Sequence, residues 1–127
     1  MNVKWCLTIA LAGVTVAGLT WPTTATVPMT QIVLEDGSPY YVPVTATAVS
    51  GSPIQWANPT ATHHTVTHTG CLDDAIPCAF DSGMLPPGST FTVPGLPPGR
   101  YAYYCRIHPI MRGVLAVTDD ASTPFQL

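Results

Sequence analysis

The sequence predicts an all-β domain, a sandwich of about seven strands. Fourteen prolines and ten glycines interrupt the 127 residues too often for long helices to form. Short runs of β-prone residues recur between turn signals, and no stretch has convincing helical periodicity. A chain of this length has room for one domain of ordinary size with a single core.

Seven runs are expected to form these strands. They lie at 31–34, 40–49, 54–56, 64–68, 90–93, 101–105 and 113–117. The segments between several of them are rich in Gly, Pro, Asp and Ser, which favour tight turns. The last run is apolar on both faces, because Val114 and Ala116 alternate with Leu115 and Val117. We therefore expect this run to be a central strand.

The N-terminal segment, residues 1–25, is typical of a secretory signal peptide. Lys4 precedes an uncharged run that ends at Trp21, and small residues around Ala25 suit cleavage. An uncleaved membrane anchor is the alternative, although the run is shorter than the roughly 20 residues that span a bilayer comfortably. In either case the domain, residues 26–120, is expected to be exported to the periplasm or another extracytoplasmic space, with residues 121–127 as a tail.

The charge balance excludes nucleic acid as a partner. After the signal segment the chain keeps three arginines against seven acidic residues, so its formal charge is three minus seven, or minus four. Nucleic-acid binding requires a basic stripe that neutralises phosphates, and the sequence contains none. We expect a monomer that contacts a membrane only through an uncleaved anchor.

The cysteines are expected to differ in role. Cys71 and Cys78 are separated by six residues rich in turn formers, which suits a local disulfide in an oxidising compartment. A second metal site that uses His63 or His68 is the alternative. Apart from Cys6 in the signal segment, Cys105 is then an unpaired thiol in an exported protein, which makes it a candidate metal ligand.

Cys105 begins the most informative motif, a Cys-x-x-His-x-x-Met run formed with His108 and Met111. The segment leaves one predicted strand, turns and enters another, so a thiolate, an imidazole and a thioether can converge on one ion. An upstream loop supplies a second imidazole, from His63 or His64. Two imidazoles, a thiolate and a weak axial thioether form the ligand set of a blue-copper site, whereas a structural zinc site usually takes a fourth strong ligand.

At these residues the chain resembles the cupredoxins, the superfamily of plastocyanin and azurin. The similarity is greatest to the amicyanin-like members, whose ligand loop has the same short spacing. It covers most of the mature chain, and the matching stretches 54–58, 64–67, 80–83, 85–88 and 98–101 occur in the family's order. The resemblance implies a Greek-key β-sandwich of seven or eight strands.

The resemblance also implies a cofactor and its ligands. One copper ion, alternating between Cu(I) and Cu(II), would be bound by His64, Cys105, His108 and Met111. The family pattern favours His64 over His63, because the upstream histidine stands immediately before Thr-Val-Thr. Thr65, the next residue, would tie this loop to the Cys105 loop by a side-chain hydrogen bond.

The function expected from this resemblance is one-electron transfer, not enzymatic catalysis. Redox proteins would dock transiently near His108, where Pro109 and Ile110 form a small apolar patch. Arg106 and Arg112 flank this patch and either favour an acidic partner or serve solubility alone. Copper storage or delivery is the alternative function, since the same ligands would bind Cu(I) tightly.

Two further residues could in principle compete for the metal. His68 is four residues along a strand from His64, about 13 Å away, so it is expected to be structural or exposed. Met84 is a spare thioether next to a turn and is expected to be a packing residue.

Overall fold

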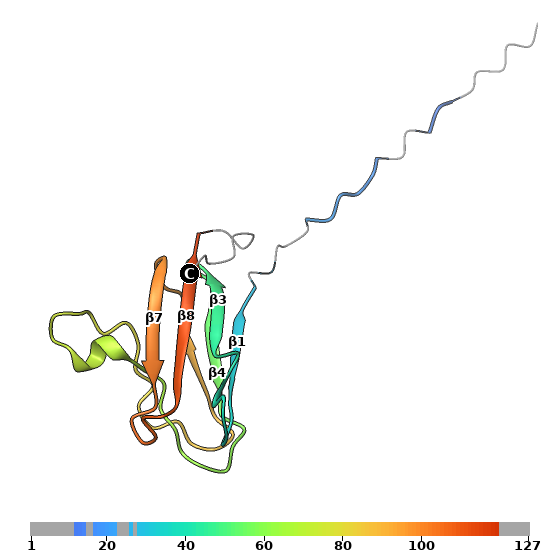
Figure 1. Cartoon of the computed structure of the whole chain (residues 1–127). Helices are drawn as coiled ribbons and strands as arrows, with labels where there is room; N and C mark the ends of the chain where they lie inside the picture. The colour runs from blue at the N-terminus through green and yellow to red at the C-terminus, as the bar shows by residue number, and fades with distance from the viewer. Residues whose placement is uncertain (1–11, 15–16, 23–25, 27, 120–127) are drawn as a thin grey trace, which may run out of the picture.

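The computed structural model describes residues 12–14, 17–22, 26 and 28–119 (Figure 1). Cys6, the expected cleavage site after Ala25 and the tail 121–127 lie outside the described residues. Among the residues that are described, no helix has the length and apolarity needed to cross a membrane. The signal peptide and its boundary with the domain therefore stay predictions.

The described part of the chain forms eight strands and one short 3-10 helix, which confirms the all-β class. The elements are β1 (Thr30–Leu34), β2 (Tyr41–Val42), β3 (Thr45–Val49), β4 (Ile54–Ala57), β5 (Thr67–His68), η1 (Thr69–Leu72), β6 (Thr90–Val93), β7 (Gly99–Tyr104) and β8 (Arg112–Thr118).

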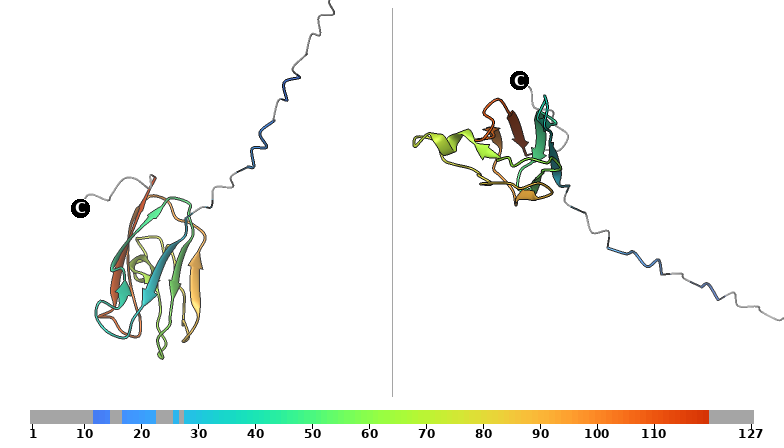
Figure 2. Two further views of the ribbon diagram at one scale, coloured as in Figure 1. Left: turned by 90° about the vertical axis from the view of Figure 1, so that its right-hand side faces the viewer. Right: turned by 90° about the horizontal axis from the view of Figure 1, so that it is seen from below.

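These strands form two four-stranded sheets that face each other as a sandwich (Figures 1 and 2). One sheet has the order β2-β1-β4-β6 and the other the order β3-β8-β7-β5. The pairs β1–β4 and β3–β8 are parallel, and the remaining neighbours are antiparallel. As predicted, the last strand is central, because β8 lies between β3 and β7 and is buried along most of its length.

The predicted strand 40–49 is wrong as a single element. It divides into β2, which pairs with β1, and β3, which pairs with β8 in the other sheet. Pro43 lies at the division and has no N–H to donate to a ladder. The chain therefore passes from one sheet to the other within a few residues.

The predicted strand 64–68 is also shorter than expected, since only β5 belongs to a sheet. His64 and Leu85 form an isolated bridge, in which each backbone N–H donates to the other's carbonyl at 3.2 and 2.8 Å. The N–H of Val66 donates to the hydroxyl of Ser82 at 2.8 Å. These contacts replace a regular ladder, because the segment lies beside residues 81–85 instead of beside a long strand.

The core between the sheets is aromatic at its centre. Trp56 on β4 is fully buried and packs against Phe80, Phe91 and Tyr103, with ring centroids 5.2, 5.8 and 5.5 Å away. Burial of several aromatic rings supplies much of the apolar area that stabilises a domain of this size. β7 and β8 are anchored on this core, so the connection between them is held at one end of the sandwich (Figure 1).

Candidate metal centre

The ligand loop, residues 105–111, is the short connection between β7 and β8. The N–H of Cys105 donates to the carbonyl of Met111 at 3.1 Å, and the N–H of Met111 donates to the carbonyl of His108 at 2.9 Å. These bonds place the two sulfur-bearing residues side by side, and both are buried. Residues 106–110 between them are exposed.

The histidine loop, residues 58–66, supplies the second segment of the site. Its conformation depends on Asn58, which is almost fully buried. The amide of Asn58 donates to the carbonyls of Thr62 and Leu85, both at 2.9 Å, and its oxygen accepts the N–H and the hydroxyl of Thr60 at 3.1 and 2.7 Å. Since every polar atom of this side chain is used, the loop is held by buried bonds that involve no candidate metal ligand.

The two loops bring three sequence-predicted ligands together. The Sγ of Cys105 lies 4.0 Å from Nδ1 of His64 and 3.9 Å from Nδ1 of His108. All three candidate ligand atoms lie within 4.8 Å of one another. Metal–ligand bonds to imidazole and thiolate are about 2.0 to 2.3 Å long, so donors at this spacing suit one ion between them. The chemistry of the donors, two imidazoles and a thiolate, fits copper.

The hydrogen bonds of His64 determine which ring nitrogen can bind a metal. Its Nε2 lies 3.0 Å from the hydroxyl of Thr60 and 2.9 Å from that of Thr62. The Thr60 hydroxyl has one proton, and its shortest contact is with the oxygen of Asn58 at 2.7 Å. It therefore accepts a hydrogen bond from Nε2, which carries the ring proton. The lone pair is left on Nδ1, which faces Cys105.

Charge and burial around His64 favour the form that binds a metal. Burial, together with the nearby His108, lowers the pKa of His64, while Asp36 acts in the opposite direction. The Oδ1 of Asp36 lies 3.8 Å from Nε2 and accepts the Thr62 hydroxyl at 3.1 Å. A lowered pKa keeps the imidazole neutral near pH 7, and only a neutral imidazole can act as a ligand.

Sequence reasoning missed the partners Asp36, Thr60 and Thr62. The two threonines could have been considered, because a ligand histidine usually donates its second ring N–H to a nearby acceptor, and both hydroxyls lie close to His64 in the sequence. Asp36 had no such signal, since it comes from a turn 28 residues upstream.

Met111 is the fourth predicted ligand, and it lies beside two of the others, His64 and His108. It lines the recess above the site together with His64, His108 and Tyr40. Its side chain is only 1% exposed, whereas that of Met84 is 61% exposed and lies outside this recess. Burial and position therefore favour Met111 as the thioether of the site.

The other histidines lie apart from this cluster. His63 is exposed. His68 is buried, its Nδ1 accepts the N–H of Ala79 at 3.2 Å, and its ring packs against Phe80 and Tyr101. Of the two roles expected for His68, structural or exposed, the contacts support the structural one.

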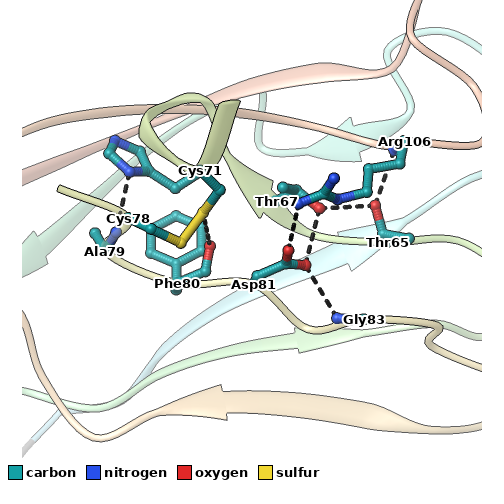
Figure 3. Close-up of a disulfide and its surroundings, with 10 residues drawn as sticks. Thr65, Thr67, Cys71, Cys78, Ala79, Phe80, Asp81, Gly83 and Arg106 are labelled. Carbon is teal, nitrogen blue, oxygen red and sulfur yellow. Dashed lines mark hydrogen bonds and ion pairs between the residues drawn. A yellow bond between two sulfur atoms is a disulfide. The ribbon is translucent and has the colours of Figure 1, made fainter. Parts of the chain in front are cut away.

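Cys71 and Cys78 form the predicted disulfide, with their Cα atoms 4.3 Å apart, next to Ala79 and Phe80 (Figure 3). The alternative of a second metal site at these cysteines is therefore wrong. Cys105 is the one free cysteine among the described residues.

Thr65 joins the two loops, as the resemblance implied. Its N–H donates to Sγ of Cys105 at 3.3 Å, and its hydroxyl accepts the N–H of Arg106 at 2.8 Å. Its carbonyl accepts the hydroxyl of Tyr41 at 2.8 Å. Thr65 thus binds both Cys105 and the next residue of the ligand loop, Arg106.

The two arginines beside the site are already engaged. The guanidinium of Arg106 pairs with the carboxylate of Asp81 at 2.6 Å. The guanidinium of Arg112 lies 5.8 Å from the ring centroid of Tyr104. The charge of Arg106 is thus balanced within the chain, which weakens the expectation that it attracts an acidic partner.

Sequence comparison finds a curated relative of this chain but no family model that matches it. The chain is 26% identical over 104 residues to the chloroplastic plastocyanin of Tetradesmus obliquus, an alignment that covers 76% of this chain and 70% of that protein.

Solved structures share the fold. A purple cupredoxin from Nitrosopumilus maritimus superposes with a TM-score of 0.60 at 24% identity, over 70% of this chain and 99% of its own. Amicyanin from Paracoccus versutus gives 0.60 at 22% identity, over 75% of this chain and 86% of its own. A copper-containing nitrite reductase from Thermus scotoductus gives 0.56 at 20% identity, over 73% of this chain but only 23% of its own.

Proposed function

Because this chain is a cupredoxin, with copper as its cofactor, we propose that it carries single electrons between redox partners outside the cytoplasm. The proposed ligands are His64, Cys105, His108 and Met111. The observation that carries the proposal is the convergence of two imidazole nitrogens and the thiol of Cys105, the one free cysteine that the structure describes, within 4.8 Å of one another. Such a donor set suits both Cu(I) and Cu(II).

The residues around the site keep it rigid. When bound, copper supplies the one-electron change between its two oxidation states. The thiolate of Cys105 is held by the N–H of Thr65, and the ring of His64 is held by Thr60 and Thr62. Because these side chains are buried and hydrogen-bonded, they move little when the charge of the site changes. A small rearrangement is what an electron carrier requires.

The exposed part of the ligand loop is the proposed docking surface for redox proteins. His108 is the one exposed member of the cluster. Beside it Ile110 is 71% exposed and Ile107 42% exposed. A small apolar patch around an exposed ligand suits brief contact with a partner. We expect the protein to act there as a monomer.

The location outside the cytoplasm is supported by the disulfide between Cys71 and Cys78. Disulfides persist in oxidising compartments and are rare in the cytosol. Residues 1–25 would direct export to the periplasm or a similar space, either as a cleaved signal or as a retained anchor, and residues 26–120 would be the mature domain.

An enzymatic role is less well supported. The nitrite reductase that shares the fold is a much longer chain, of which this protein matches 23%. Within the described residues, the ligand cluster is the only group of histidine, cysteine and acidic side chains arranged to hold a metal. A catalytic copper enzyme needs a further site for its substrate. Storage or delivery of copper remains the competing role, and the experiment below separates the two.

Titration of the mature, metal-free protein with Cu(II) tests the proposed function. We expect one intense visible band from the thiolate-to-copper transition, which saturates at one copper per chain. Cys105→Ser is the control, and it should abolish the band because no thiolate remains. A colourless complex of the unaltered protein, or reduction to Cu(I) that oxidant cannot reverse, would favour storage or delivery.

A further inference from the structure

A chain of polar groups connects the ligand loop to Asp81, which lies outside the metal centre (Figure 3). The N–H of Arg106 donates to the hydroxyl of Thr65 at 2.8 Å. The hydroxyls of Thr65 and Thr67 are 3.0 Å apart, and that of Thr67 donates to Oδ1 of Asp81 at 3.1 Å. Thr65 and Thr67 are buried, so water does not compete for these bonds.

The two ends of this chain fix the direction of every bond in it. A backbone N–H can only donate, and an ionised carboxylate can only accept. The proton of Thr67 is given to Asp81, so the Thr67 oxygen must accept from Thr65. The proton of Thr65 is then committed to Thr67, and its oxygen accepts from Arg106. Asp81 thereby orients both hydroxyls in a single arrangement.

Thr65 has no unused polar group as a result. Its hydroxyl is engaged on both sides, its carbonyl accepts the hydroxyl of Tyr41, and its N–H is aimed at Sγ of Cys105. A residue whose backbone and side chain are held at four points cannot rotate without breaking several buried bonds. The N–H that reaches the sulfur is therefore held in place by groups that never touch the metal centre.

Asp81 is itself fixed in the charged form. Its second oxygen pairs with the guanidinium of Arg106 at 2.6 Å, and its first oxygen also accepts the N–H of Gly83 at 3.1 Å. Burial tends to raise the pKa of this carboxyl, but the bonds from Gly83, Arg106 and Thr67 together lower it. Arg106 thus contacts both ends of this series of hydrogen bonds: its N–H binds Thr65, and its guanidinium binds Asp81.

We propose that Asp81 is a positioning residue, which holds the N–H of Thr65 against Cys105 through Thr67 and thereby tunes the reduction potential. The tuning of the reduction potential rests on the proposed electron-transfer function, whereas the positioning of the N–H does not. Reduction adds an electron to the site, so a donor to sulfur stabilises the reduced form, and removal of a negative charge near the site also favours that form.

Two substitutions are expected to shift the potential in opposite directions. Thr67→Val removes the link while it keeps the shape of the side chain, so the N–H of Thr65 is held less firmly and the potential should fall. Asp81→Asn keeps an oxygen that can accept from Thr67 but removes the negative charge beside Arg106, so the potential should rise. A merely structural role would lower stability in both variants without opposite shifts of the potential.

The experiment has two arms, one of which needs no metal. In the metal-free mature protein, amide hydrogen exchange at Arg106 is measured by NMR, with Leu115 on β8 as a distant reference. Thr67→Val should speed exchange at Arg106 at least tenfold and leave Leu115 unchanged, while Thr67→Ser, which keeps the hydroxyl, should match the unaltered protein. In the second arm, voltammetry of the copper-loaded variants should show the two opposite shifts.

Unchanged exchange at Arg106 in Thr67→Val would overturn the proposed positioning, and potentials that move together or not at all would overturn the tuning. If no variant, nor the unaltered protein, forms a coloured copper complex, the electron-transfer function fails, and the exchange arm still decides the positioning. Should Thr67→Val not fold, Thr67→Ala replaces it in both arms. Because it also lacks the hydroxyl, faster exchange at Arg106 and a lowered potential support the proposal, and no change in either contradicts it.

Discussion

The two loops that supply the site differ in how they are held. In the histidine loop, the polar atoms of Asn58 and Thr60 bind other residues of the loop and the carbonyl of Leu85, and His64 is 2% exposed. In the ligand loop, bonds hold Cys105 and Arg106 at one end and Met111 at the other, and the side chains of residues 107–110 are exposed. One side of the site is thus rigid and buried, and the other side is open to a partner. An electron carrier needs both properties at the same metal.

The largest expected effect comes from the rigid side. His64→Ala should weaken copper binding by more than about 100-fold and remove the visible band, because loss of a ligand costs more than loss of its supporting contacts. His63→Ala is the matched control and should bind copper as the unaltered protein does, since His63 is exposed. Copper affinity and the spectrum are measured for both. If His63→Ala lost copper binding and the band instead, His63 and not His64 would be the metal ligand.

A smaller effect is expected at Met111, the buried end of the ligand loop. A long axial contact adjusts the relative stability of the two copper states more than it binds the ion. Met111→Gln offers a harder oxygen donor and should lower the reduction potential, while Met111→Leu removes the donor and should raise it. Both should keep one copper per chain, as measured by voltammetry together with metal analysis.

Met84→Leu is the control for these variants, because its side chain is 61% exposed and should not affect the potential. Loss of copper in both Met111 variants would make this residue an anchor. Unaltered potentials in both would remove it from the site.

The smallest effect is expected at His68, on the same segment as His64 but beyond the site. Burial lowers the pKa of His68 in the folded protein below the value of about 6.5 in the unfolded chain. Between those two pKa values the unfolded chain binds more protons, so the free energy of unfolding falls as the pH is lowered through this window. His68→Gln, which keeps an acceptor for the N–H of Ala79, should show a weaker decrease between pH 7 and 5.

This comparison is made by chemical denaturation of the metal-free protein with its disulfide intact. An equal pH dependence in the two proteins would mean that burial of His68 does not affect its protonation.

The parts of this molecule that could be predicted are those encoded over short distances. The spacing from Cys105 to Met111 follows directly from the sequence, as does the local pairing of Cys71 with Cys78. The central position of β8 follows from its two apolar faces. Each of these signals lies within a dozen residues, where the geometry of turns and strands constrains what can meet.

The parts that could not be predicted depend on contacts between distant segments. Asp36 reaches Thr62 and Asp81 reaches Arg106 across 26 and 25 residues. Nothing in the local sequence distinguishes these carboxylates from solvated ones. The division of the strand 40–49 was missed because its residues are β-prone throughout, and only the change of sheet at Pro43 separates β2 from β3.

Reversible voltammetry of the copper-loaded mature protein tests electron transfer most directly. We expect one one-electron wave, with equal oxidation and reduction currents over repeated cycles, and one copper per chain before and after. This result follows if the buried side chains hold the ion equally in both states. Loss of copper on reduction, or a reduced form that does not reoxidise, would contradict electron transfer and support a role in holding or delivering the metal.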